Sequence, residues 1–195
     1  MNEETRNKII SAAGKRFAHY GYGKTTMAEI AKDCDMSVGN LYRFYKNKEA
    51  IAAAGAEACF LVKAESSEAA NDRDQPAIEQ LSAFLIARLR YMHRFVSETP
   101  HMHEMVELVS TKHKSLLQYY ENRAIDYMAG IIESAQQRGE VRAGDPLDMA
   151  RNLYRAMISF NMPLCMFGAL DEKEAQLRSL LEMFFRGLEN REGDI

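Results

Sequence analysis

The sequence predicts an all-α fold of about nine helices, with a three-helix head at the N-terminus and a longer helical body after it. Three observations predict this fold. Apolar residues recur at the three- and four-residue spacing of helices that bury one face. No stretch beyond residue 50 alternates apolar and polar residues as a half-buried strand would. The chain has 195 residues, of which 47% are hydrophobic and 27% charged, and this composition is typical of a globular protein.

The first predicted helix ends where a glycine follows its apolar face. Ile9, Ala13, Phe17 and Tyr20 share that face at helical spacing. Gly21 follows directly and can adopt the left-handed conformation that ends many helices. We therefore expect the first helix to stop at this glycine.

Two short helices follow, and a tight turn separates them. Thr26 and Glu29 have the spacing of a capping box, in which each side chain bonds to the backbone of the other. The helix that starts there ends near Cys34. Ser37 is a good N-cap for the second short helix, which runs to about Tyr45, and a fourth helix starts after residue 47.

Helix boundaries in the body are marked by N-cap residues next to Pro or acidic residues, and by glycines. The predicted starts are Asp74–Pro76, Thr99–Pro100, Asp145–Pro146 and Asp171–Glu174, and the predicted stops are Gly139 and Gly168.

Basic residues are concentrated in the head. Residues 1–50 contain nine Lys or Arg against six Asp or Glu, whereas the rest of the chain contains 16 against 22, and the net charge is −3. A uniformly basic nucleic-acid coat is therefore excluded, and any binding of a polyanion belongs to the head.

The sequence shows neither a membrane span nor an export signal. The longest apolar segment, 156–170, is shorter than the roughly 20 residues of a membrane helix and contains Ser159, Asn161 and Pro163. The three cysteines are odd in number and far apart, which is typical of reduced thiols. We therefore expect a soluble cytoplasmic protein that does not associate with membranes.

The segment from about residue 26 to 45 has the pattern of a helix-turn-helix motif. Its second helix exposes Gly39, Asn40, Tyr42 and Arg43, and two lysines follow it. A glycine lets the backbone approach DNA, Asn and Arg side chains read base edges, and Tyr and Lys side chains bond to phosphates. The alternative is a purely structural three-helix unit with a solvated polar face.

These residues resemble the TetR family of one-component transcriptional regulators. The resemblance lies in residues 5–55, where the matching positions are Thr5-Arg6, Ile9-Ile10, Ala12-Ala13, Phe17, Gly21-Tyr22, Thr25-Thr26, Ile30-Ala31, Ser37-Val38-Gly39-Asn40-Leu41-Tyr42 and Lys48-Glu49. It implies a helix-turn-helix DNA-binding domain at 1–48 and a helical ligand-binding and dimerisation domain at 49–195. The implied function is that of a homodimeric repressor, which a small effector releases from a pseudo-palindromic operator. Activators and corepressed regulators share such heads, so the direction of the response stays open.

The resemblance also implies individual DNA contacts. Thr25 or Thr26, Tyr42 and Lys48 would contact phosphates, while Gly39 and Asn40 would face bases. The complete predicted set is Thr25, Thr26, Ser37, Gly39, Asn40, Tyr42, Arg43, Tyr45, Lys46 and Lys48.

The chain departs from the family pattern at two positions. Asp35 stands where glycine is usual, and Asp tolerates a left-handed turn conformation. Phe44 replaces a residue that could donate a hydrogen bond to a phosphate, so we expect that contact to be weaker or to shift to Tyr45.

Two C-terminal helices predict the dimer interface. Apolar residues cover a wide stripe of the last helix and all sides of the helix before it, whose main apolar face runs from Ala150 to Cys165. We expect both helices to pair with their copies as a four-helix bundle about a two-fold axis; an ordinary monomer core is the alternative. The predicted interface residues are Leu153, Met157, Phe160, Leu164, Leu177, Leu181, Phe184 and Phe185.

Soft and aromatic residues of the middle helices predict a small-molecule cavity. Twelve methionines give the chain an adaptable interior, which would suit an apolar or aromatic effector. Ordinary packed core is the alternative. The predicted lining is Arg88, Tyr91, Met92, Phe95, Met102, His103, Met105, Tyr127, Met128 and Phe160.

Four of the five histidines lie between positions 93 and 113 and raise the weaker hypothesis of a metal site. His103 and Glu107 share a helix face, and His101 could join them from the preceding turn. The spacing matches no strong zinc signature, so we expect no metal and no cofactor.

The sequence contains no nucleophile elbow, phosphate loop or His-Glu-x-x-His motif that would favour an enzyme. A helical adaptor that does not bind DNA is the remaining alternative.

Overall fold

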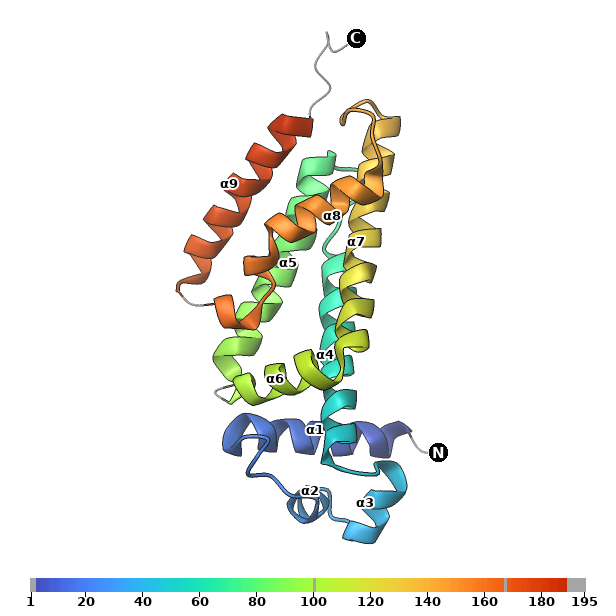
Figure 1. Cartoon of the computed structure of the whole chain (residues 1–195), viewed down its shortest axis with the longest axis vertical. Helices are drawn as coiled ribbons and strands as arrows, with labels where there is room; N and C mark the ends of the chain where they lie inside the picture. The colour runs from blue at the N-terminus through green and yellow to red at the C-terminus, as the bar shows by residue number, and fades with distance from the viewer. Residues whose placement is uncertain (1–2, 100, 167, 189–195) are drawn as a thin grey trace. The chain divides into compact units, whose positions relative to one another are not determined.

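The computed structural model describes residues 3–99, 101–166 and 168–188, and every regular element within them is helical. Figure 1 shows their arrangement. The helices are α1 (Glu3–Tyr20), α2 (Met27–Asp33), α3 (Val38–Phe44), α4 (Lys48–Ala69), α5 (Ala77–Glu98), α6 (Met102–Lys112), α7 (Lys114–Gln137), α8 (Pro146–Ala156) and α9 (Leu170–Leu188), with short 3₁₀ helices at Ile158–Phe160 and Pro163–Cys165. The predicted all-α class is confirmed. No described helix is long and apolar enough to cross a membrane.

The chain divides into two compact units. Unit 1 contains the chain up to Leu61 together with Phe95–Gln118, and unit 2 contains Val62–Arg94 together with the chain from Tyr119 onward. The predicted boundary after residue 48 differs from this division, because the first part of α4 and the whole of α6 pack with the head. Helical periodicity gives no sign of this, since α6 is remote from the head in the sequence.

Capping signals set the helix boundaries in unit 1. The Thr26 hydroxyl accepts from the Glu29 amide at 3.3 Å and the Thr26 amide donates to the Glu29 carboxylate at 2.8 Å, which confirms the capping box. The Ser37 hydroxyl accepts from the amide three residues later at 3.2 Å and caps α3. Gly21 ends α1 with φ 89°, and Asp35 adopts φ 55° in the turn between α2 and α3.

The core of unit 1 joins α6 to the helix-turn-helix. In Figure 1, α1 lies between α6 on one side and α2 and α3 on the other. One cluster of buried residues contains Ile9, Ala13, Phe17, Ile30, Leu41, Ile51 and Leu108, and so has members from α1, α2, α3, α4 and α6. The head therefore takes part of its apolar cover from a helix of the second half of the chain.

Helix α8 is shorter than predicted. It ends at Ala156 and is followed by two 3₁₀ helices, the second of which starts at Pro163. The expectation of one continuous helix through Ala150 and Cys165 is therefore wrong. Pro163 lacks the backbone N–H that a helix interior needs, which fits its place at the start of the second 3₁₀ helix. The surface assigned to one long helix is divided among short elements.

Five of the predicted interface side chains are buried within the single chain. Leu153, Met157, Leu177 and Leu181 are at most 1% exposed, and Phe185 is 8% exposed. The expectation that these side chains face a second copy is therefore wrong, because the chain itself covers them. Of the other predicted interface residues, Phe160 and Phe184 are half-buried and the side chain of Leu164 lies outside the described residues.

Candidate nucleic-acid interface

Helix α3 presents a polar surface that the core does not use. Leu41 is its one buried residue, whereas Tyr42 is 51% exposed and Arg43 is also exposed. Lys46 follows the helix and is exposed as well. Gly39 is exposed, and a Cβ atom added to it would have no neighbour within 4 Å. The backbone of α3 is thus open to close approach by a large partner.

The first turn of α3 contains one engaged and one available polar side chain. The Ser37 hydroxyl is used as the cap that accepts from the Asn40 amide. The side-chain amide of half-buried Asn40 forms no hydrogen bond within the described part of the chain. A free carboxamide at this position can form paired hydrogen bonds with a base edge.

The structure corrects two of the predicted phosphate contacts. Thr25 is 2% exposed, and its hydroxyl donates to the Gly21 carbonyl at 2.9 Å. Tyr45 is 6% exposed, packs in the core of unit 1 and stacks against the Arg6 guanidinium at 4.9 Å. Both side chains stabilise the head, so neither is exposed enough to bind a phosphate.

Lys48 ties α4 to the turn that precedes α2. Its ammonium group donates to the carbonyls of Tyr22 at 2.5 Å and Thr25 at 2.8 Å, and lies 4.2 Å from the centre of the Tyr22 ring. Burial lowers the pKa of this lysine. Its predicted phosphate contact would compete with these three interactions, so its clearest role in the structure is to hold the turn.

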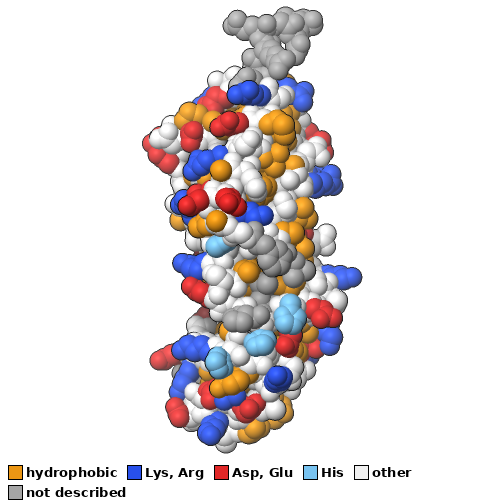
Figure 2. Space-filling view, turned by 90° about the vertical axis from the view of Figure 1, so that its left-hand side faces the viewer, with side chains coloured by type: hydrophobic (Ala, Val, Ile, Leu, Met, Phe, Trp, Pro, Cys, Tyr) orange, Lys and Arg blue, Asp and Glu red, His pale blue; other side chains and the backbone are white. Residues whose placement is uncertain are grey.

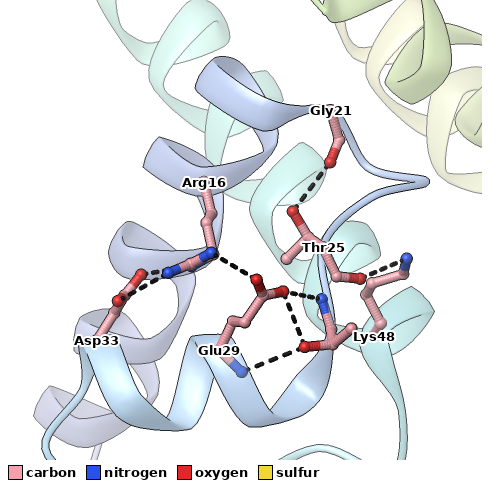
Figure 3. A network of polar contacts seen from close by, with 7 residues as sticks. Arg16, Gly21, Thr25, Glu29, Asp33 and Lys48 are labelled. Atoms are coloured by element: carbon pink, nitrogen blue, oxygen red, sulfur yellow. Dashed lines mark hydrogen bonds and ion pairs between the residues drawn. The ribbon is translucent and has the colours of Figure 1, made fainter.

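A polar network fixes α1 against α2 (Figure 3). The Arg16 guanidinium bonds to both Asp33 carboxylate oxygens at 2.6 and 3.1 Å and pairs with Glu29 at 3.2 Å. Its hydrogen bond lowers the pKa of Asp33 and raises that of Arg16. The Thr26 hydroxyl donates to the same Glu29 carboxylate at 2.8 Å, so the exposed Thr26 side chain is already engaged.

Two functional candidates were absent from the prediction. Lys24 is exposed in the loop before α2 and is a candidate for binding a phosphate. In the sequence, its positive charge next to Thr25 and Thr26 could have indicated this role. The Glu104 carboxylate of α6 accepts from the Gly23 amide at 2.5 Å. No local pattern could indicate that contact, because 81 positions separate the two residues.

Comparison with known proteins decides the family. The profile described as "Bacterial regulatory proteins, tetR family" matches residues 9–54, and the profile described as "Tetracyclin repressor-like, C-terminal domain" matches residues 77–180. The second match covers more than half of the chain. The chain belongs to the TetR family. It is therefore a DNA-binding transcriptional regulator of a family whose members are typically repressors.

Three similar proteins illustrate the range of the family. The biofilm operon icaADBC HTH-type negative transcriptional regulator IcaR of Staphylococcus epidermidis is 30% identical over 129 residues, which cover 60% of this chain and 69% of IcaR. A transcriptional regulator from Cytophaga hutchinsonii has a TM-score of 0.73 at 22% identity, over 93% of this chain and 97% of the other. Thermus thermophilus FadR, a TetR-family repressor in complex with lauroyl-CoA, has a TM-score of 0.63 at 19% identity, over 97% and 98% of the two chains. The two structural likenesses show a shared fold.

In this TetR-family chain, the predicted cavity residues are distributed over both units. Phe95, His103 and Met105 belong to unit 1, where Met105 packs against the core of the head and His103 is exposed. These two assignments to a cavity in the body are corrected, because one side chain fills the head and the other faces solvent. The side chain of Met102 lies outside the described residues.

The other predicted cavity residues lie in unit 2. Arg88, Met92 and Met128 are buried, and Tyr91, Tyr127 and Phe160 are half-buried. The Tyr127 ring stacks on Phe84 at 4.8 Å and its hydroxyl donates to the Glu68 carbonyl at 3.2 Å. Six of the predicted cavity residues therefore belong to unit 2.

The structure gives the metal hypothesis no support. The ring centres of His101 and His103 are 6.5 Å apart, and Glu107 lies on the exposed surface of α6. Within the described ranges, no three His, Cys, Asp or Glu side chains are arranged to hold a metal ion.

Proposed function

We propose that this TetR-family chain is a homodimeric repressor that reads a pseudo-palindromic operator with α3. The observation that carries the proposal is the exposed polar face of α3. Arg43 and Lys46 are exposed on or directly after α3, and α3 contains no acidic residue, so this face is suited to a polyanion. A short helix with such a face fits the major groove, where base edges are most distinct.

The side chains of α3 divide into base-reading and phosphate-binding groups. Asn40 has a free carboxamide and Gly39 an open backbone, so these two residues are assigned to bases. Tyr42 and Lys46 are exposed at the end of the helix and are assigned to phosphates. Arg43 is exposed between them and can bond to either group.

Exposed apolar side chains near the C-terminus support a dimer with a surface that differs from the predicted one. Ile158 is 47% exposed, Met162 37% and Met183 66%, and the half-buried Phe160 and Phe184 belong to the same segments. Figure 2 shows hydrophobic side chains between the charged ones on the face that it draws. A two-fold dimer through such residues would present two copies of α3 to successive major grooves.

A small effector would release this repressor by a shift of population. The complex of FadR with lauroyl-CoA supports an effector for the present chain as well. The effector must bind the DNA-incompetent arrangement more tightly than the competent one, because equal affinity for both changes nothing.

The first experiment identifies the operator. Purified protein is mixed with sheared genomic DNA of its source, and the bound fragments are recovered and sequenced. We expect enrichment of a pseudo-palindromic site. Absence of enrichment at low salt would contradict the proposal.

Variants of the head then test the assigned contacts by fluorescence anisotropy with the recovered site. Asn40→Ala should weaken binding by about 1 to 3 kcal/mol and relax the preference at one base pair. Lys46→Ala should weaken binding to all duplexes alike and reduce the salt slope by about one. Arg151→Ala, which removes an exposed arginine from α8, is the matched control and should change neither quantity. Equal losses for Asn40→Ala on all sequences would remove its assignment to a base.

A further inference from the structure

Two cations are buried in unit 2. Lys63 on α4 is 6% exposed, and Arg88 on α5 is 4% exposed. The two charges act on each other, and Glu121 on α7 acts on both. Three helices therefore bring two positive groups and one acid to the same interior.

Neither cation has a carboxylate partner among the described residues. Arg88 bonds to neutral groups: its Nε donates to the Asn161 side-chain oxygen at 3.3 Å, and it forms a hydrogen bond with Tyr154. Its guanidinium also lies 5.4 Å from the centre of the Phe84 ring. The Lys63 ammonium forms no hydrogen bond and no ion pair with any residue in ranges 3–99, 101–166 and 168–188.

The nearby acids leave one positive charge in excess. Glu121 is half-buried and forms no ion pair with a described residue, and one carboxylate cannot balance two cations. Glu68 also acts on Arg88, but its carboxylate is held by Arg123 through two hydrogen bonds of 2.8 and 2.9 Å. The interior thus has the opposite charge balance to the body as a whole, which is acidic.

This arrangement costs stability in the free protein. Burial, with the Arg88 charge as a further cause, holds the pKa of Lys63 well below its ordinary value, and burial raises the pKa of Glu121. Buried charges are normally paired, and strongly perturbed ionisable groups are concentrated at functional sites. A core built for stability alone would place apolar residues at these positions.

We propose that Lys63 and Arg88 bind the carboxylate of a small organic acid, with Tyr154 as a further hydrogen-bond donor. The inference rests on the proposed function, because it names the chemical class of the effector. Burial and Arg88 disfavour the charged form of Lys63 in the free protein; a bound carboxylate would favour that form and, together with Glu121, would balance the two positive charges. The stacked rings of Phe84 and Tyr127, next to Arg88, offer apolar contact to an aliphatic or aromatic body.

Isothermal titration tests the class of ligand with matched pairs. The probes are decanoate and naphthoate, and their neutral counterparts are decanol and naphthalenemethanol. Charge-assisted hydrogen bonds from two buried cations should make at least one acid bind about tenfold more tightly than its alcohol. No binding of either acid, or equal affinity for acid and alcohol, would overturn the proposal.

Variants test the two residues with the acid that binds. Lys63→Met and Arg88→Met should each weaken binding by about tenfold or more, and Arg88→Lys should retain part of the affinity because it keeps the charge. Arg90→Met is the matched control, because Arg90 is exposed and pairs with Glu174 at 2.6 Å. A Lys63→Met variant that binds the acid as the unaltered chain does would overturn the assignment of this residue.

Two further measurements separate the possible explanations. The thermal midpoint of unliganded Lys63→Met should be higher than that of the unaltered chain, because methionine removes the cost of burying an amino group. A lower midpoint with unchanged affinity for the acid would show that Lys63 has only a structural role. Operator binding is measured on the same samples. Protein that binds the operator but no acid refutes only the present inference, whereas protein that binds an acid but no DNA refutes the proposed function.

Discussion

Helix α9 offers a direct test of the dimer proposal, because it carries a buried and an exposed apolar residue close together. Leu181 is 0% exposed and Met183 is 66% exposed. Replacing each residue with Asp introduces the same carboxylate into two different environments. The two variants therefore separate a contribution to folding from a contribution to association.

The expected magnitudes follow from the burial of each side chain. Leu181→Asp removes a fully buried leucine, which contributes about 1.5 to 3 kcal/mol, and leaves an unpaired carboxylate in apolar surroundings at a further cost. Together these losses are comparable with the roughly 5 to 15 kcal/mol that stabilises a native protein. Met183→Asp loses only the buried third of a methionine, and about 1 kcal/mol is an upper bound for that loss. We expect Leu181→Asp to abolish cooperative folding and Met183→Asp to leave it intact.

Urea denaturation followed by circular dichroism measures folding, and light scattering measures the oligomeric state. Met183→Asp should fold normally and shift the chain from dimer to monomer, while Glu182→Ala, the exposed neighbour, should change neither property. A Leu181→Asp chain that is monomeric yet as stable as the unaltered chain would refute the burial reasoning. A Met183→Asp chain that stays fully dimeric would remove this face of α9 from the proposed interface.

Two predictions concern the stability of unit 1. Glu104→Ala leaves the Gly23 amide without its charged acceptor. Urea denaturation should show a loss of about 1.5 to 3 kcal/mol in the free energy of unfolding. An unchanged urea midpoint would show that water replaces the carboxylate. The hydrogen bond from Arg16 lowers the pKa of Asp33 in the folded chain below its ordinary value of 3.8. The pair therefore stabilises the fold above pH 3.8, and this stabilisation is lost as the pH falls through the lowered pKa of the folded chain. Thermal midpoints of the unaltered chain should therefore fall more steeply below pH 3.8 than those of Asp33→Asn, and parallel curves would contradict this reasoning.

Local signals predicted the helix-turn-helix well, because its boundaries depend on contacts a few residues apart. The capping box of Thr26 and Glu29 and the cap at Ser37 are complete within three positions. The left-handed turn at Asp35 likewise follows from the tolerance of one residue type. Features of this kind are visible in the sequence because nothing distant competes with them.

The sequence could not show which apolar faces the chain covers by itself. Periodicity placed Leu153, Leu177 and Leu181 on apolar stripes, but it does not distinguish a partner's surface from the chain's own interior. The sequence likewise does not show that Tyr45 packs in the core of unit 1, where it cannot take over a phosphate contact from Phe44. Lys63 carried a weak signal, as a lone charge within the apolar segment 60–64, but only the neighbouring helices show that it is buried beside Arg88.

Helix α4 connects the two proposed activities. Its first residue, Lys48, bonds to the turn before α2, and its later residue Lys63 belongs to the buried cation cluster. An acid that binds Lys63 thus acts on the same helix that holds the DNA-reading motif. Binding changes operator affinity only if the acid prefers one arrangement of the chain. Lys63 and Arg88 supply a physical basis for that preference. In the free protein, their mutual repulsion opposes any arrangement that brings the two side chains together. A bound carboxylate offsets this repulsion only in the arrangement in which both side chains contact it.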